Sequence, residues 1–228
     1  MSKKTWIIFA VLCIAVLGGL VILSRKDSVD VSNVNQSNLQ KATATDGNIA
    51  DHVTDLPNSK VVLIEYGDYQ CPYCGEAYPQ VKKLTTDYAS KITFVFRNYP
   101  LVTLHPNAKA AAAAAEAAGI QGKYWEMHDK LYESQDDWSN LSTNDRTNKF
   151  VSYAKAIGVK NLTKFQTDMG SNSVEKKIDF DLALGGKFGV TGTPTFELNG
   201  QKVSDTVSAS LISGDGDAMR STIDNLLK

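Results

Sequence analysis

The chain has 228 residues, of which 43% are hydrophobic and 21% charged, and its formal net charge is −1. This length can bury one substantial hydrophobic core once the first fifty residues are set aside. The near-neutral charge and the lack of a basic stripe in the sequence argue against nucleic acid as a partner.

An uncharged, mostly apolar run covers residues 6–23, and two cationic residues flank it on each side. Its length just suffices to cross the hydrocarbon core of a bilayer. The apolar part of a cleavable signal peptide is usually about 7 to 15 residues long and is followed by an Ala-x-Ala-like site. We find no such site in the sequence, and we therefore predict a transmembrane signal-anchor over residues 1–24. A cleaved signal peptide is the alternative.

Residues 25–50 are rich in Ser, Asn, Asp and Thr and contain no aromatic side chain. A segment of this composition buries little apolar surface. We predict a flexible linker here, with a short amphipathic helix around residues 34–42 as the alternative. The folded domain is then expected over residues 51–228.

A hydrophobic strand is predicted over residues 61–66, and the sequence Cys71-Pro72-Tyr73-Cys74 follows at the expected start of a helix over residues 71–89. Sulfurs one helical turn apart can form a disulfide. The free N–H groups and the dipole of a helix start favour a thiolate, and such motifs have pKa values of about 3.5 to 7.5. We predict a redox dithiol in which Cys71 faces solvent and Cys74 lies behind it.

The remaining cysteine, Cys13, lies inside the apolar run, so the chain has no structural disulfide framework. A Cys-x-x-Cys pair is also half of a zinc site, which needs two more ligands at suitable spacing. His52, His105 and His128 are scattered singly, and we expect His128 to be a structural residue on a helix. We therefore expect neither a metal nor another cofactor.

Glu65 lies in the middle of the first predicted strand, Val-Val-Leu-Ile-Glu-Tyr. If its side chain points into the core, burial raises the pKa of the carboxyl group. Alternation along a half-buried strand is equally compatible with a surface position. The strand pattern leaves both positions open.

Beyond the cysteines, the pattern predicts a strand, a long helical stretch, two strands joined by a turn, and a final helix. Alanine is the best helix former, so packing explains the alanine run inside the helical stretch. The expected ranges are residues 92–98, about 102–188, 195–198, 201–207 and about 215–227, with the turn at Asn199-Gly200.

A second motif, Gly192-Thr193-Pro194-Thr195-Phe196, has a proline at the start of a strand, where proline is tolerated. Together with the Cys-Pro-Tyr-Cys motif, it resembles the DsbA-like family of disulfide oxidoreductases, and the match runs from about residue 61 to the C-terminus. The resemblance implies an α/β thioredoxin fold with an inserted α-helical subdomain. It also implies a cis Thr193–Pro194 bond beside the disulfide, where an ordinary trans proline at a strand edge is the alternative.

The resemblance further implies the site residues. Cys71, Cys74 and Glu65 are the expected catalytic residues, and Glu65 would pass a proton to or from Cys74. Substrate contacts are expected at Pro72, Tyr73, Thr193 and Pro194. The chain departs from enterobacterial DsbA at Tyr73, where that protein has a histidine whose positive charge favours oxidising power.

A dithiol oxidant works where thiols are not kept reduced, so we expect the catalytic domain outside the cytoplasm, at the cell membrane on a single-pass anchor. The resemblance implies that it introduces disulfides into unfolded or reduced secreted proteins. It also implies a quinone-linked membrane reoxidase, DsbB-like or vitamin K epoxide reductase-like. The alternatives are a membrane-tethered reductase or isomerase, and a thioredoxin-fold binding module or holdase.

Overall fold

The structure is a computed structural model that describes residues 6, 9, 29–54 and 59–228. The predicted signal-anchor over residues 1–24 lies almost wholly outside these residues. Within the described residues, no helix has both the length and the apolar character needed to cross a bilayer. The chain divides into two units, Met1–Asp30 and Val31–Lys228, and the second unit carries the fold.

A five-stranded mixed sheet forms the centre of this unit, with the strand order β1-β3-β2-β4-β5. Strands β2 and β3 run parallel, and the other neighbours are antiparallel. A parallel pair requires a crossover connection, which α2 provides. The strands are β1 His52–Val53, β2 Val61–Gly67, β3 Ile92–Asn98, β4 Thr195–Leu198 and β5 Gln201–Lys202.

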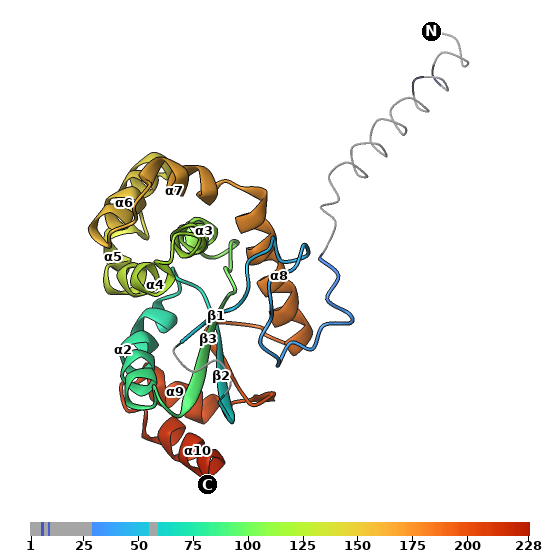
Figure 1. Ribbon diagram of the computed structural model, residues 1–228, viewed down its shortest axis with the longest axis vertical. Coiled ribbons are helices and arrows are strands. Elements are labelled where there is room, and N and C mark those ends of the chain that lie inside the picture. The colour runs from blue at the N-terminus through green and yellow to red at the C-terminus, as the bar shows by residue number, and fades with distance from the viewer. Residues whose placement is uncertain (1–5, 7–8, 10–28, 55–58) are drawn as a thin grey trace. The chain divides into compact units, whose positions relative to one another are not determined.

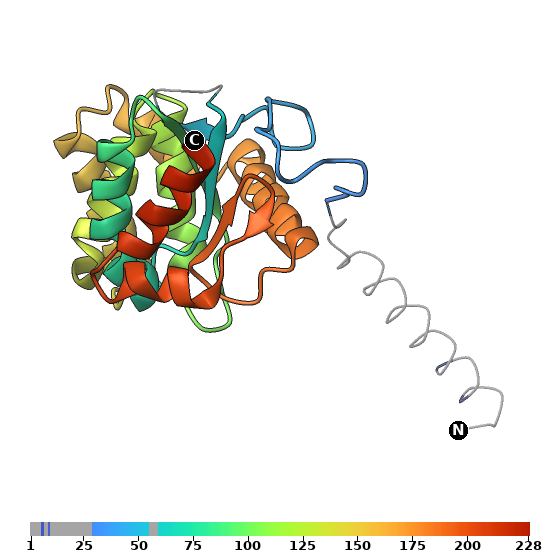
Figure 2. The same cartoon turned by 90° about the horizontal axis from the view of Figure 1, so that it is seen from below.

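Helices cover both faces of the sheet: α8 lies on one face, and α2, α9 and α10 lie on the other (Figures 1 and 2). All seven residues of β3 are buried, as expected for a strand between two helical layers. The helices are α2 Pro72–Asp87, α3 Ala108–Gly119, α4 Tyr124–Glu133, α5 Gln135–Trp138, α6 Thr143–Ala156, α7 Leu162–Met169, α8 Asn172–Phe188, α9 Asp205–Ile212 and α10 Asp217–Leu227.

The predicted strands over residues 61–66, 92–98 and 195–198 match β2, β3 and β4 within one residue. The expected helical insertion corresponds to α3 through α8, between β3 and β4. The expected turn at Asn199-Gly200 is also present, and both residues have the positive φ angles, 47° and 83°, that a tight hairpin turn favours.

The predicted strand over residues 201–207 is wrong beyond Lys202. The Ser204 side chain accepts a hydrogen bond from Val207 N and caps α9, which begins at Asp205. A serine at this position satisfies a free N–H group of the first helical turn. The valines of this segment have a high strand propensity, and the capping serine overrides it.

The prediction of a flexible linker over residues 25–50 is wrong for the part that belongs to the folded unit. From Val31 onwards the segment packs on the domain, because two cationic side chains bind its backbone carbonyl groups. Lys187 Nζ donates to Val31 O, Ser32 O and Val34 O over 2.7–3.0 Å, and Arg97 donates to Gln36 O and Asn38 O. We call residues 31–51 the strap.

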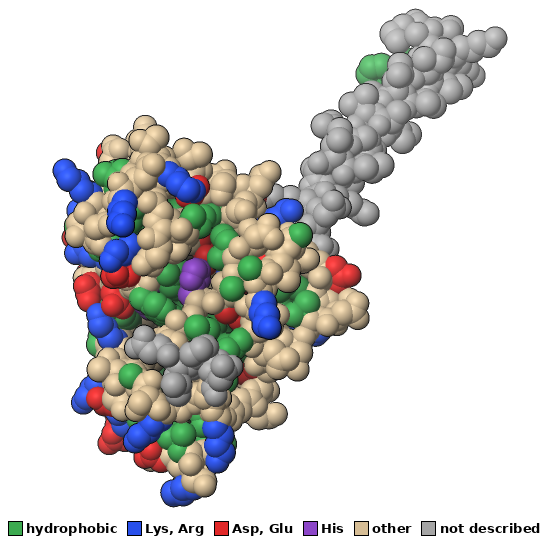
Figure 3. Space-filling view, in the orientation of Figure 1, with side chains coloured by type: hydrophobic (Ala, Val, Ile, Leu, Met, Phe, Trp, Pro, Cys, Tyr) green, Lys and Arg blue, Asp and Glu red, His purple; other side chains and the backbone are tan. Residues whose placement is uncertain are grey.

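A buried charge network joins the strap to β3 and α8. Asp51 accepts hydrogen bonds from Arg97 Nη2 (2.7 Å) and Lys177 Nζ (3.1 Å), and Lys177 also donates to Asp181 (2.8 Å). Burial opposes the charge of Asp51, but Lys177 and Arg97 together hold the pKa of its carboxyl group well below its usual range. On the face shown in Figure 3, by contrast, acidic and basic side chains are interspersed.

Candidate active site

The two cysteines lie where the chain leaves β2 and enters α2. Cys71 is the N-cap of α2, with an extended backbone (φ −67°, ψ 123°), and Pro72 is the first helical residue. Proline suits the first helical position, because a backbone N–H there has no partner within the helix and proline lacks that N–H. Cys71 O accepts the first hydrogen bond of the helix, from Gly75 N over 3.1 Å. Both cysteines are free thiols.

Both cysteines are buried, with exposed fractions of 3% for Cys71 and 0% for Cys74. The prediction that Cys71 faces solvent is therefore wrong. Its sulfur lies against the Thr193 backbone, 3.3 Å from Thr193 O, to which the protonated thiol donates a hydrogen bond. The covering residue is 122 positions away in the sequence, so the local motif could not reveal it.

The surroundings give the two thiols opposite acidities. A hydrogen bond from the Cys74 thiol, assisted by Thr193 and by the N–H groups of Cys74 and Tyr73, outweighs desolvation and lowers the pKa of Cys71 to about 6. Burial raises the pKa of Cys74 well above its ordinary value, and the neighbouring Cys71 sulfur adds to that shift. Near neutral pH, Cys71 is thus a thiolate and Cys74 a thiol.

Glu65 occupies the buried one of the two positions that the sequence leaves open. It lies on β2 between Phe96 of β3 and Phe196 of β4, and it is 3% exposed. Burial, and secondarily the negative charge of Cys71, raises the pKa of Glu65 to about 8. Glu65 in turn contributes to the raised pKa of Cys74. The three groups therefore interact electrostatically beneath the start of α2.

The Thr193–Pro194 peptide bond is cis, as the resemblance implies. Thr193, Pro194 and Tyr73 border one pocket of about 260 Å³, whose opposite side is formed by α9. Tyr73 is 60% exposed and forms the outer edge of the pocket. Pro72 does not line this pocket; it borders a separate hollow between α2 and the loop into α5. Three of the four expected substrate contacts are therefore brought together.

The turn before Cys71 is held by side chains that were not predicted from the sequence to belong to the site. Asp68 Oδ1 accepts a hydrogen bond from Gln70 N (2.8 Å), and Asp68 Oδ2 accepts one from Leu101 N (2.9 Å). His105 Nδ1 also lies 2.7 Å from Asp68 Oδ2. Each of these contacts except the first crosses more than thirty residues of sequence, and the only local signal is the position of Asp68 next to the cysteine motif.

The helical insertion also reaches this turn. Gln70 Oε1 accepts a hydrogen bond from Asn107 N (2.6 Å), and Gln70 Nε2 donates to Ser139 O (2.8 Å). Gln135, the first residue of α5, donates from Nε2 to Tyr69 O and Cys71 O. No motif in the sequence identifies Gln135, because it lies in an ordinary polar stretch 64 residues after Cys71.

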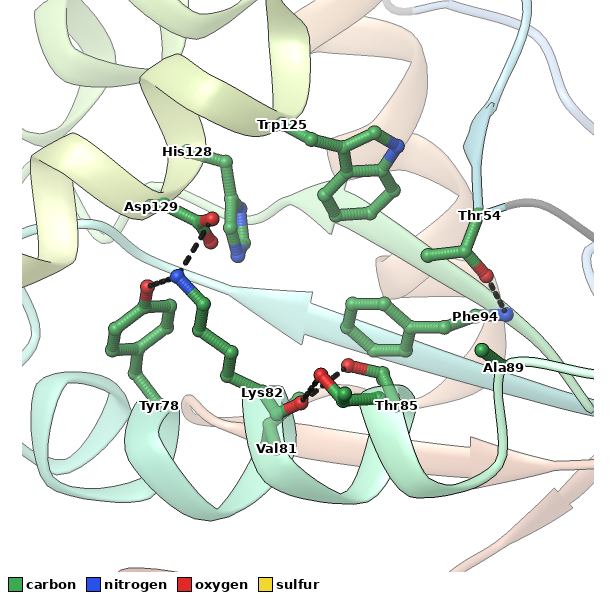
Figure 4. A pocket seen from close by; sticks show the side chains of 11 residues that line it. Thr54, Tyr78, Val81, Lys82, Thr85, Ala89, Phe94, Trp125, His128 and Asp129 are labelled. Atoms are coloured by element: carbon green, nitrogen blue, oxygen red, sulfur yellow. Dashed lines mark hydrogen bonds and ion pairs between the residues drawn. The ribbon is translucent and has the colours of Figure 1, made fainter.

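A third hollow, of about 390 Å³, lies between α2 and α4, and neither Cys71 nor Cys74 lines it (Figure 4). Lys82 Nζ crosses it and binds the Tyr78 hydroxyl (3.0 Å) and Asp129 (2.9 Å). His128 is buried beside them, and burial lowers its pKa to about 3. Its Nδ1 pairs with the Tyr69 hydroxyl over 3.0 Å, so His128 is a packed structural residue, as predicted.

This architecture is similar to that of known thioredoxin-fold proteins. The thioredoxin family model matches residues 48–214. The oxidised BdbD of Bacillus subtilis superposes with a TM-score of 0.66 at 21% identity, covering 85% of this chain and 99% of that one. The thiol-disulfide exchange protein α-DsbA2 of Wolbachia pipientis superposes with a TM-score of 0.61 at 23% identity, covering 77% of this chain and 87% of that one.

Among curated proteins, the chain is 39% identical over 152 residues to a protein of Salinispora arenicola named as a Na⁺/H⁺ antiporter. That match covers 67% of this chain but only 22% of the antiporter. The chain spans about a quarter of the length of such relatives. The sheet order, the helical insertion and the family match together confirm the predicted fold: the chain belongs to the thioredoxin family and has the DsbA-like form of its fold.

Proposed function

We propose that the protein is an extracytoplasmic thiol:disulfide oxidoreductase that introduces disulfides into reduced secreted or surface proteins through Cys71 and Cys74. The observation that carries the proposal is the opposite acidity of the two thiols, with the pKa of Cys71 lowered to about 6 and that of Cys74 raised. Stabilising the thiolate stabilises the reduced pair, which makes the corresponding disulfide a stronger oxidant. The likeness to a protein named for thiol-disulfide exchange supports this choice.

The reaction begins from the Cys71–Cys74 disulfide. A thiolate of the substrate protein attacks the Cys71 sulfur, a mixed disulfide forms, and the Cys74 sulfur leaves with the electron pair of the broken bond. A second substrate thiolate then attacks the substrate sulfur of the mixed disulfide and expels the Cys71 thiolate. The substrate has lost two electrons and two protons, and the enzyme holds the electrons as its dithiol.

Glu65 supplies the proton for the buried leaving group in this scheme. With its pKa raised to about 8, the carboxyl group is protonated near neutral pH and can protonate the departing Cys74 sulfur. It can take the proton back when Cys74 must act as a nucleophile. The pKa of Cys74 is well above its ordinary value, so an unprotonated Cys74 sulfur is unfavourable in the core. A neighbouring carboxyl group that donates and accepts the proton avoids this unprotonated state.

The substrate contacts follow from the pocket beside the cysteines. We place the substrate segment that carries the reacting cysteine along Thr193 and Pro194, with Tyr73 on its outer side. Because Cys71 is only 3% exposed, the substrate sulfur must enter between the start of α2 and this backbone. Pro72 contributes from the other side of the motif, where it borders the separate hollow next to α5.

Turnover requires an acceptor for the two electrons of the reduced pair. We propose a quinone-linked membrane reoxidase, DsbB-like or vitamin K epoxide reductase-like, as that partner. The apolar run over residues 6–23 would serve as a single-pass anchor. Tethering both proteins to one membrane raises their effective concentration, which favours repeated encounters.

The proposal is tested with the oxidised full chain and a reduced two-cysteine substrate protein, by following the loss of free thiols. We expect rapid loss with the parent chain and with Cys13→Ser, and none with Cys71→Ser. Cys74→Ser cannot form the internal disulfide that the substrate thiolate attacks, so it should also leave the substrate thiols unreacted. Equal thiol loss with and without Cys71 would refute an enzymatic role and leave a binding module or holdase.

The direction of the reaction is tested by equilibrating the same pair against glutathione. The lowered pKa of Cys71 favours an oxidant. A measured potential near that of thioredoxin, about −270 mV, would instead assign the protein to the reductases.

A further inference from the structure

One amide side chain of the helical insertion holds the backbone of the active-site turn. Gln135 Nε2 donates one hydrogen bond to Tyr69 O over 2.7 Å and another to Cys71 O over 2.9 Å. The amide group has two N–H donors, and these two bonds use both of them. The two carbonyl groups lie on either side of Gln70, so Gln135 closes a bridge across the turn.

We propose that Gln135 is a positioning residue for the thiol chemistry of Cys71, because its amide fixes the turn in the conformation that directs the first N–H groups of α2 at the sulfur. This inference rests on the proposed function and names a residue that controls it from the insertion. It requires no contact between Gln135 and the reacting sulfur.

The Cys71 carbonyl group accepts two hydrogen bonds, the first helical bond from Gly75 N and the bond from Gln135. The backbone of Cys71 sets where its sulfur lies relative to the N–H groups of Tyr73 and Cys74, which stabilise the thiolate. Without the amide, the turn gains conformations in which these donors are misaligned, and the thiolate is less favoured.

The residue that faces Gln135 on α2 supports this reading. A Cβ atom on Gly75 would lie 2.5 Å from Gln135 Oε1 and 3.1 Å from its Cδ. Glycine is a poorer helix former than alanine, so a glycine inside α2 weakens the helix. Its absent side chain leaves the space that the amide occupies.

Other contacts between the insertion and the turn act at different residues. Asn107 and Ser139 bind the side chain of Gln70, and His105 binds Asp68. Gln135 reaches the backbone of the reactive cysteine itself. It therefore links the position of α5 directly to the orientation of Cys71.

Two variants of the full chain test the inference. Gln135→Met keeps the length of the side chain and removes both donors. Gly75→Ala keeps the amide but displaces it, and should leave α2 at least as stable because alanine favours a helix. The matched control is Gln121→Met: Gln121 also bridges backbone groups within the insertion, with Nε2 2.9 Å from Asn161 O and Oε1 3.0 Å from Asn161 N.

The readout is the rate at which iodoacetamide alkylates Cys71 in the reduced protein between pH 4 and pH 9, resolved from the other cysteines by mass spectrometry. We expect the pKa of Cys71 to rise by about half a unit to one unit in Gln135→Met and in Gly75→Ala, the size expected for one hydrogen bond. At pH 5 this is a roughly three- to tenfold loss of thiolate. Gln121→Met should titrate like the parent.

The outcomes separate this inference from the proposed function. A parent chain with a low pKa for Cys71 and two unchanged variants would overturn the role of Gln135 and leave the proposed function standing. If the pKa of Cys71 shifts in Gly75→Ala alone, the effect belongs to helix α2, and the proposed role of Gln135 is also overturned. A parent chain whose Cys71 titrates near about 8.5, like a free cysteine, would overturn the proposed function itself.

Discussion

Replacing Glu65 by glutamine should make the reduced protein more resistant to unfolding, and increasingly so as the pH rises. The glutamate is 3% exposed, and burial raises the pKa of its carboxyl group from 4.5 to about 8. Because the folded-state pKa is raised, the contribution of this group to the free energy of unfolding is fully present below pH 4.5. It is lost as the pH rises through about 8. Glutamine has the same shape and no proton to lose.

The size of the effect follows from the shift. The pKa of Glu65 is about 3.5 units higher in the folded protein than its ordinary value of 4.5. At pH 7, about 2.5 of these units lie below the working pH, so that part of the stabilisation is lost. One pH unit corresponds to about 1.4 kcal/mol, so the charged carboxylate costs roughly 3 to 4 kcal/mol at pH 7, and this cost approaches about 5 kcal/mol above pH 8. The stability difference between Glu65→Gln and the parent should therefore grow by about 3 kcal/mol between pH 5 and pH 7.

The assay is urea unfolding of both proteins at several pH values between 5 and 8, with excess reductant to keep the cysteines as thiols. Glu116→Gln is the matched control. Glu116 is also buried, but His52, 2.8 Å away, outweighs the desolvation and lowers its pKa. Its stabilising contribution is present above pH 4.5 and is lost as the pH falls, so its replacement should destabilise the protein at pH 7. A Glu65→Gln difference that stays constant from pH 5 to pH 8 would refute the argument that burial holds this carboxyl group neutral.

Three further predictions concern the thiols and the buried charges. Alkylation of the reduced protein should show Cys71 reacting with a midpoint near pH 6 while Cys74 stays unmodified up to pH 9, and equal reactivity of the two would contradict the opposite shifts. Tyr73→His should place a cationic imidazole near the Cys71 thiolate and shift the equilibrium with glutathione toward the reduced enzyme, measured as the fraction of dithiol; an unchanged fraction would show that the side chain at this position does not reach the sulfur. Lys177→Met should lower the free energy of unfolding by roughly 3 to 5 kcal/mol, because it removes the cation that the buried Asp51 and Asp181 share. In the same urea titration, replacing its exposed neighbour, Lys176→Met, should change this free energy by less than about 0.5 kcal/mol.

The sequence predicts the parts of this fold that depend on local composition. The hydrophobic runs of β2, β3 and β4 are bounded by turn residues, so their ends could be located within one residue. The cysteine motif and the Thr193–Pro194 motif are separated by about 120 residues, and only their resemblance to a known family predicts that they meet. The structure places them in contact, with Cys71 against Thr193 O.

The features that could not be predicted depend on contacts over long sequence distances. The face on which Glu65 lies cannot be read from alternation, because β2 is buried on both sides and its pattern is nearly continuous. Gln135 lies in a polar stretch without a motif. The strap has the composition of a linker, and it is ordered by Lys187, more than 150 residues away, which binds its carbonyl groups.

On the proposal that the apolar run over residues 6–23 is a membrane anchor, the strap would limit the distance between the catalytic domain and the membrane. Since residues 31–51 are folded onto the domain, seven residues, 24–30, are left between the apolar run and the folded unit. Fully extended, they would span at most about 25 Å. This short connection would keep the catalytic domain close to the bilayer. Secreted chains would then be oxidised as they emerge from export, before they diffuse away.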